Sequence, residues 1–460
     1  MTRPKECIIC NEKAKSAEHI FPASLGGRRT NKGIYCNFHN NHFGSLVARL
    51  EKQLAMMNAL LEIRPDRKNE PKPYLFKDDD TGYQLLGREV SVELPPPFDP
   101  SQVDLNGDFL LRAPSEESAK RWVEENSQDG LQFKISKIGD VQSHYQTNKH
   151  KIELHFGGGD FMQAVAYLAL TFFSHSFPNE ARQSGLAPMK TFLLESFNDE
   201  LTQFPSDIVW WDGREPRDVV GENPYDFGHA VLVGISDTSS HAYVYISFFS
   251  CLNFGIDLGR VEPQREVRSV KSFIDPTSDS ARDSVTELKS DHFASVLGEN
   301  TVTLHNMIHS GSAANALNHF FNKVEDRHVS LAMTNIQEEL SNTTGDDFSV
   351  FQGIVHKQRQ VVFNLLSEVV KGLCLNFSSH PEIQKILSLM VLANPDRSDG
   401  LEELASMTIQ LNLEFFAHEL MLMHSRNKAS LENLRRLFYG DVGCKIIVEN
   451  INRSIVPMLK

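Results

Sequence analysis

Three helical regions and several strand-like runs can be distinguished along the chain. From Gly44 to Leu61, apolar residues recur every three or four positions with charged residues between them, which predicts an amphipathic helix. The run from Phe161 to Phe177 is apolar on most faces and predicts a buried helix. Helical periodicity then dominates residues 301–460, which are predicted to form a mainly helical domain of ordinary size.

Strand-like runs are confined to the first 260 residues. Short ones occupy residues 82–87 and 89–94 and follow a stretch rich in proline and charge. Two longer runs, 229–236 and 241–258, are separated by a polar turn and predict antiparallel strands. Residues 261–300 are polar, show no clear period and are predicted to be a linker or a mobile loop region.

Cysteine use and the lack of long apolar runs favour a cytoplasmic protein. The first ten residues contain no apolar signal-peptide core, and no stretch approaches the ~18–20 consecutive apolar residues of a membrane helix. Cys251, Cys374 and Cys444 lie singly in apolar surroundings, as buried free cysteines do. The other three of the six cysteines cluster near the N-terminus, and in a reducing compartment such a cluster indicates metal ligands.

Charge is distributed unevenly along the chain. The formal net charge of −14 argues against a protein that coats nucleic acid over its whole surface. Residues 1–75, however, hold 13 Lys and Arg against 7 Asp and Glu, a net charge of +6, so the remainder carries −20. A basic head on an acidic body favours a polyanion partner at the N-terminus.

The cysteine cluster has the spacing of a zinc site. Cys7-x-x-Cys10 and Cys36-x-x-His39 supply two pairs of ligands, and two such pairs complete a tetrahedral shell. A shell closed by four protein ligands has no open position, so this zinc is predicted to be structural. A head of ~50 residues has little core of its own, and the metal would supply folding energy.

The residues between and after the two pairs form a longer motif. Glu18 and His19 begin "EHIFP", "SLGG" follows, Asn31 precedes the second pair, and Asn40 comes directly after it. Over residues 7 to about 54 this combination resembles the zinc-containing branch of the HNH endonuclease family. In that family a cysteine pair, an acidic-His-Ile-x-Pro strand, a glycine turn, an Asn and a second pair build a ββα-metal finger.

The resemblance implies a role for each of these residues. His19 would be the general base, Asn31 would orient its ring, and Glu18 and Asn40 would hold a catalytic Mg²⁺ or Mn²⁺. The residue types suit phosphodiester hydrolysis, because imidazole titrates near the working pH and Mg²⁺ prefers oxygen ligands. Zinc and the catalytic metal would thus have separate tasks.

Two positions depart from the family pattern. Glu18 stands where Asp is commoner, which moves the carboxylate one methylene further out. His39 stands where Cys is usual, although zinc accepts a Cys₃His set. The run "HNNH" also leaves the register open, so that Asn40, Asn41 and His42 are all candidates for the catalytic metal.

Five basic residues lie between the cysteine pairs: Lys13, Lys15, Arg28, Arg29 and Lys32. They form either an ordinary solvated basic face or a set of phosphate anchors. Beside a phosphodiester site the second interpretation is favoured.

The expected fold class is α+β and multidomain. It comprises a zinc-stapled ββα-metal finger, a central mixed α+β domain and a mainly helical C-terminal domain. The expected segments are 1–68 (nuclease domain), 69–103 (linker with short strands), 104–260 (α+β accessory domain), 261–300 (linker or mobile loop) and 301–460 (helical domain).

The expected function is metal-dependent DNA cleavage by an HNH endonuclease, with bacterial anti-phage defence as a hypothesis for its role. DNA would dock on the basic head, no membrane is involved, and the helical domain is a candidate surface for a second copy or a partner protein. The alternative is a non-catalytic zinc module that recognises nucleic acid or protein within a regulatory protein.

Overall fold

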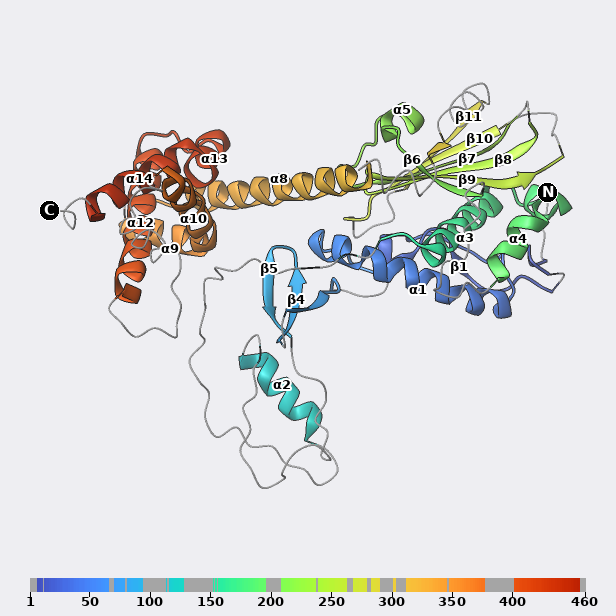
Figure 1. The fold of residues 1–460 in the computed structure, drawn as a ribbon, viewed down its shortest axis with the longest axis horizontal. Helices are drawn as coiled ribbons and strands as arrows, with labels where there is room; N and C mark the ends of the chain where they lie inside the picture. Colours follow the sequence, from blue (N-terminus) through green and yellow to red (C-terminus); the bar gives the residue numbers. More distant parts are fainter. Residues whose placement is uncertain are drawn as a thin grey trace. The chain divides into compact units, whose positions relative to one another are not determined.

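The chain folds into two units (Figure 1). The computed structural model describes residues 6–10, 12–65, 70–78, 81–93, 113, 116–127, 152, 154, 156–195, 208–236, 239–262, 268–278, 283–289, 301–302, 312–345, 347–376 and 401–455. Among these residues the boundary between the units lies between Val324 and Glu325. The first unit combines sheets with helices and the second is helical, so the mixed α+β class is confirmed.

The N-terminal segment forms two very short strands and a long helix. Strand β1 (Glu18–His19) pairs antiparallel with β2 (Thr30–Asn31), which places Glu18 opposite Asn31. Helix α1 (Asn37–Leu60) follows and begins earlier than the predicted start near Gly44. Its first turn has one apolar residue, the exposed Phe38, and so shows no hydrophobic period, but Cys36 caps it by accepting a hydrogen bond from the His39 N–H.

A small three-stranded sheet lies beside α1. Its strands are β3 (Tyr74–Asp78), β4 (Thr81–Leu86) and β5 (Glu89–Val92), in that order and antiparallel. The last two confirm the predicted short strands, whereas β3 was not predicted because it directly follows the proline-rich stretch. Helix α2 (Glu116–Asn126) comes next in the chain.

A seven-stranded antiparallel sheet forms the centre of the first unit, in the order β11-β10-β7-β8-β9-β6-β12. Its strands are β6 (Val209–Asp212), β7 (His229–Ile235), β8 (His241–Phe248), β9 (Leu252–Arg260), β10 (Arg268–Ile274), β11 (Asp283–Lys289) and β12 (Thr301–Val302). Strands β7, β8 and β9 confirm the two predicted runs, the second of which is split by a turn at Phe249 and Ser250.

The prediction of a linker over residues 261–300 is wrong where the structure describes this stretch. Strand β10 pairs with β7 on one side and with β11 on the other. Backbone hydrogen bonds to β7 recruit this polar segment into the sheet, and such pairing leaves little trace in hydrophobic periodicity.

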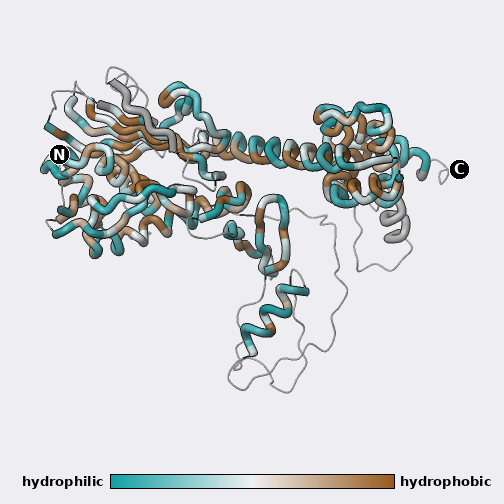
Figure 2. The backbone as a smooth tube through the Cα atoms, turned by 180° about the vertical axis from the view of Figure 1, so that it is seen from behind, coloured by the Kyte–Doolittle hydropathy of each residue, from teal (hydrophilic) through white to brown (hydrophobic). Residues whose placement is uncertain are grey.

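Helices cover one face of the large sheet. Helix α3 (Gly159–Ser176), which confirms the predicted buried helix, and α4 (Ala187–Leu194) pack on the sheet, and α1 packs on α3 (Figure 1). Figure 2 shows hydrophobic residues concentrated along the central strands and the helices against them. One continuous core joins the predicted segments 1–68 and 104–260, so the N-terminal head is packed on the body through apolar contacts.

The opposite face of the sheet carries a smaller apolar cluster. Alternate residues of a strand point to opposite faces, so Ala230 and Leu232 of β7 join this cluster while Val231 and Val233 join the main core. The short helix α5 (Pro216–Val220) covers it.

His229 is a buried histidine within the main sheet. Its Nδ1 accepts a hydrogen bond from the Phe249 N–H at 3.2 Å, and its ring lies 4.8 Å from that of Phe21 in the N-terminal head. Burial lowers the pKa of His229 from its ordinary value of 6.5 to about 3. The imidazole is therefore neutral in the folded protein at physiological pH.

Because of this histidine, the free energy of unfolding should decrease as the pH is lowered. Because the pKa is lower in the folded state than in the unfolded state, the stabilisation is present above pH 6.5 and is lost as the pH falls toward 3. When the pH is lowered from 7 to 5, the protonation of His229 in the unfolded state should reduce the free energy of unfolding by about 2 kcal/mol. Chemical denaturation at both pH values measures this free energy, which should depend correspondingly less on pH in His229→Leu than in wild type. The exposed His319 supplies the control, since His319→Leu should keep the wild-type dependence.

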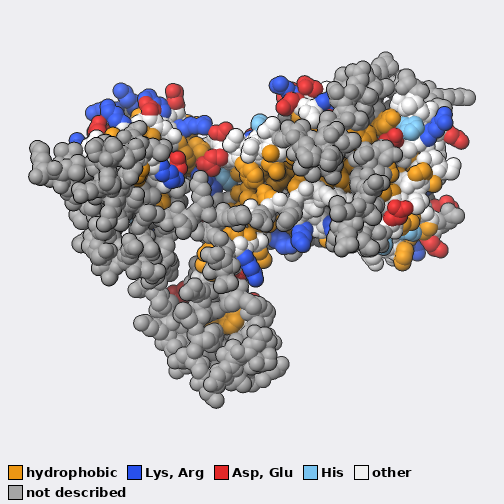
Figure 3. Space-filling model, viewed as in Figure 1, with side chains coloured by type: hydrophobic (Ala, Val, Ile, Leu, Met, Phe, Trp, Pro, Cys, Tyr) orange, Lys and Arg blue, Asp and Glu red, His pale blue; other side chains and the backbone are white. Residues whose placement is uncertain are grey.

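The second unit is helical throughout its described residues. It contains the C-terminal part of α8 (Ser312–Ser341), with α9 (Phe348–Lys357), α10 (Arg359–Asn376), α12 (Leu401–Ser425), α13 (Leu431–Tyr439) and α14 (Asp441–Ile455). Phe351, Phe416 and Phe438 are among its core residues. Basic and acidic side chains intermix over α13 (Figure 3), where Arg435 pairs with Asp326 and Arg436 with Asp441. The described residues from Glu325 onward are mainly helical, as predicted, but the unit begins later than residue 301, because Thr301–Val302 form β12 of the large sheet.

Within the described ranges, no helix has both the length and the apolar character needed to cross a membrane.

Candidate metal centre and active site

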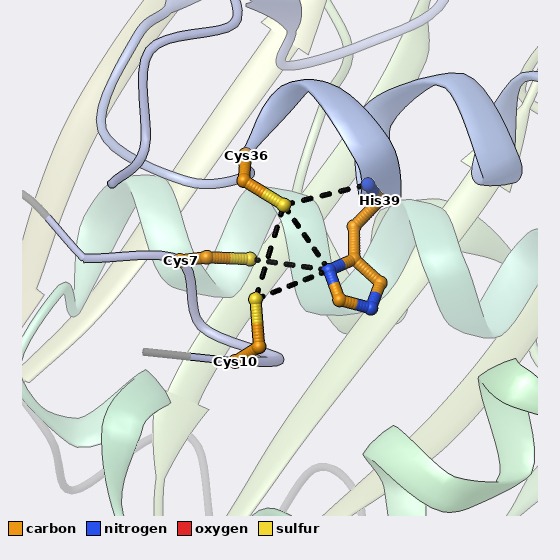
Figure 4. Close-up of side chains that lie close together, drawn as sticks. All are labelled: Cys7, Cys10, Cys36 and His39. Carbon is orange, nitrogen blue, oxygen red and sulfur yellow. Dashed lines mark hydrogen bonds between the residues drawn. The ribbon is translucent and has the colours of Figure 1, made fainter. Parts of the chain in front are cut away.

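The four residues predicted to bind zinc lie together (Figure 4). The Sγ atoms of Cys7, Cys10 and Cys36 and a ring nitrogen of His39 all fall within 4.8 Å of one another. The Nδ1 atom of His39 lies 3.7, 3.4 and 3.2 Å from the sulfurs of Cys7, Cys10 and Cys36, in that order. The Cys10 and Cys36 sulfurs are 3.8 Å apart.

These distances suit a tetrahedral zinc ion. With Zn–S bonds of about 2.3 Å and Zn–N bonds of about 2.0–2.1 Å, tetrahedral geometry requires sulfurs about 3.8 Å apart and nitrogen about 3.5 Å from sulfur. Three thiols and one imidazole are also the ligand types that zinc prefers. The cluster could therefore hold a structural zinc, as the sequence predicted.

Local structure prepares two of these ligands. Burial alone would raise the pKa of Cys36, but hydrogen bonds, foremost from the His39 N–H at the start of α1, lower that pKa overall. Burial and the neighbouring His42 lower the pKa of His39. These shifts favour the thiolate of Cys36 and the neutral imidazole of His39, the forms that bind zinc, whereas burial raises the pKa of Cys10 to about 11.

Arg182 ties this cluster to the body of the first unit. Its guanidinium donates to the backbone carbonyl of Glu6, next to Cys7, and to that of Gly33 at 2.8 Å. It lies in the short 3₁₀ helix Glu180–Arg182, directly after α3. One side chain thus holds the segments that carry both pairs of ligands.

Glu18 lies half-buried against α3 and α1. Its Oε1 accepts a hydrogen bond from the Tyr167 hydroxyl at 2.7 Å, and its carboxylate also accepts one from the Asn40 side chain. Burial raises the pKa of Glu18. The hydrogen bonds from Tyr167 and Asn40 and the charge of His19 oppose this shift, but the effect of burial is larger, so the pKa lies above its ordinary value. A bound cation would relieve this burial cost by favouring the ionised carboxylate.

The structure separates the three candidates in "HNNH". The Asn40 side chain reaches Glu18, whereas Asn41 and His42 are exposed. The Oδ1 atom of Asn40 is buried and has no hydrogen-bond partner. A buried carboxamide oxygen without a partner is costly unless a donor or a cation occupies the space beside it. Together with the neighbouring Glu18 carboxylate it offers two oxygen ligands of the kind that Mg²⁺ or Mn²⁺ binds.

Asn31 makes hydrogen bonds that were not expected. Its Oδ1 accepts from the Gly33 N–H at 2.9 Å, and its Nδ2 donates to Nδ1 of His175 at 3.0 Å. The resemblance implies that it orients His19, but its partner across the strand pair is Glu18, and His19 pairs with Thr30. In the structure its carboxamide instead contacts α3.

Family models, curated proteins and solved structures gave no match. Function is therefore inferred from the geometry of the site and from the resemblance of its motif.

The five candidate DNA contacts differ in their exposure to solvent. Lys13, Lys15 and Lys32 are exposed, whereas Arg28 and Arg29 are half-buried. Arg28 donates to the backbone carbonyl of Arg64 at 2.7 Å, so part of its role is to hold the segment that follows α1.

The sequence did not point to Tyr167 and His175 as site residues. Both lie on α3, where the helix reads as buried core. One signal was available, since Tyr167, Thr171 and His175 place polar atoms at every fourth position of an otherwise apolar helix.

Proposed function

We propose that this chain is a metal-dependent endonuclease of the HNH type that hydrolyses DNA phosphodiester bonds. The main support is the hydrogen-bonded pair of Glu18 and Asn40, which leaves a buried Asn40 oxygen without a partner beside a carboxylate. The adjacent His19 and the Cys₃His cluster complete the arrangement that the motif implies.

In this proposal His19 is the general base. It accepts a proton from a water molecule as the water oxygen bonds to phosphorus. The bond from phosphorus to the 3′ oxygen breaks, and the released 3′ oxyanion takes a proton from water, which leaves a 3′-hydroxyl and a 5′-phosphate. Glu18 and Asn40 would hold Mg²⁺ or Mn²⁺, whose charge would offset the negative charge that develops on the phosphate and the leaving oxygen.

DNA would dock on the basic head. Lys13, Lys15 and Lys32 offer exposed charges for phosphate oxygens, while the acidic remainder of the chain repels DNA from other surfaces. A role in host defence, and a partner protein or second copy on the helical unit, stay predictions.

Plasmid cleavage tests the proposal. Wild-type protein should nick or linearise supercoiled plasmid with Mg²⁺ or Mn²⁺ and should be inactive with a chelator of divalent cations. Glu18→Gln keeps the shape of the side chain but removes its charge, so it should lower the cleavage rate at least about 100-fold and weaken Mn²⁺ binding.

The exposed Glu12 in the same head supplies a matched control, and Glu12→Gln should cut like wild type. Cleavage that is independent of metal, or equal in Glu18→Gln and wild type, would contradict the proposal. No cleavage by folded wild type with either metal would favour the non-catalytic zinc module.

A further inference from the structure

Helix α3 contacts both strands of the candidate active site. Tyr167 donates to Glu18 of β1, and His175 accepts from Asn31 of β2, with Glu18 and Asn31 paired across the two strands. Between them on the helix, Thr171 hydrogen-bonds the Tyr35 hydroxyl at 2.9 Å. Residues four apart share one side of a helix, so a single stripe of α3 supports the strand pair.

The position of the Tyr167 hydroxyl is tightly defined. Tyr167 is 3 % exposed, and its ring centroid lies 5.7 Å from that of Tyr35 and 5.1 Å from that of Phe43. Because the Tyr167 ring packs against both of these rings, its side chain has little rotational freedom. The donor therefore meets the Glu18 carboxylate at a fixed point.

Glu18 gains more from such a donor than an aspartate would. A glutamate has one more rotatable bond, so its carboxylate is less well placed by the backbone alone. We propose that Tyr167 is a positioning residue, which holds the Glu18 carboxylate in the orientation that binds the catalytic divalent metal. The hydroxyl occupies Oε1 and so holds the carboxylate where it also meets the side chain of Asn40.

This inference rests on the proposed metal site, and the two can be tested apart. Mn²⁺ binding measured by electron paramagnetic resonance reports the site without any DNA. Tyr167→Phe should weaken Mn²⁺ binding about 10- to 100-fold, the usual cost of removing a hydrogen bond to a metal ligand. In cleavage assays the Mg²⁺ concentration for half-maximal rate should rise, while the rate at saturating Mg²⁺ should change far less.

Tyr35→Phe is the matched control. It also removes a buried tyrosine hydroxyl, but one that bonds Thr171 rather than Glu18, on a ring stacked against Tyr167. Its Mn²⁺ binding should stay near that of wild type. Zinc content and the melting temperature of both variants confirm that the fold is intact.

Equal Mn²⁺ affinity in Tyr167→Phe and Tyr35→Phe would overturn the positioning role, and so would a wild type that binds no Mn²⁺. A wild type that binds Mn²⁺ but cuts no DNA would refute the proposed nuclease, while a selective loss of Mn²⁺ binding in Tyr167→Phe would still support the role of Tyr167.

Discussion

His19→Ala is expected to cleave plasmid DNA about 10²- to 10⁴-fold more slowly than wild type, the usual contribution of a general base. His19 follows Glu18 on β1 and is half-buried, so its ring remains partly accessible to substrate and water. Alanine removes the proton acceptor without altering the strand pairing, which is made by the backbone. Single-turnover cleavage at saturating Mg²⁺ measures the effect on the chemical step.

Two further measurements separate a base from a metal ligand. His19→Ala should bind Mn²⁺ nearly as wild type does, in contrast to Glu18→Gln, and added imidazole should restore part of its rate. His356, an exposed histidine of the helical unit, provides the control, because His356→Ala should cut at the wild-type rate. Undiminished cleavage by His19→Ala would remove His19 from the mechanism.

Cys36→Ser is expected to cause the largest loss of stability. Cys36 serves twice, as one of the four clustered ligands and as the N-cap of α1. Structural zinc contributes about 10–16 kcal/mol of binding free energy in small zinc domains, and losing one of its thiolates forfeits much of this. The N-cap adds about 1 kcal/mol. Metal analysis should find about one zinc per chain in wild type and almost none in Cys36→Ser.

Loss of zinc should spread beyond the head, since its apolar residues share one core with α3 and the large sheet. Thermal unfolding of the first unit should therefore shift to a clearly lower temperature in Cys36→Ser. Cys444 of α14, outside the cluster, supplies the control, and Cys444→Ser should retain its zinc. Full zinc occupancy in Cys36→Ser, or none in wild type, would contradict the assignment.

The spacing of neighbouring residues in the sequence was enough to predict the zinc-type cluster and several helices and strands. The spacing of Cys7, Cys10, Cys36 and His39 predicted a zinc-type cluster, and these four side chains lie together in the structure. The apolar run that begins at Phe161 predicted α3, and the longer strand-like runs predicted β7, β8 and β9. Such features depend on ligand geometry over a short loop or on burial of one segment, and both leave a record in neighbouring residues.

Contacts between distant segments could be decided only by the tertiary structure. Tyr167 and Glu18 are separated by 149 positions, and Tyr167 reads in the sequence as one more core aromatic. The pairing of β10 with β7 was equally hidden, because a ladder of backbone hydrogen bonds accepts almost any side chain. Periodicity records that a residue is buried, but not against what. The sequence alone therefore predicted the four clustered ligands, whereas folding brought Asn40 to Glu18 and placed Tyr167 and His175 of α3 against the two strands.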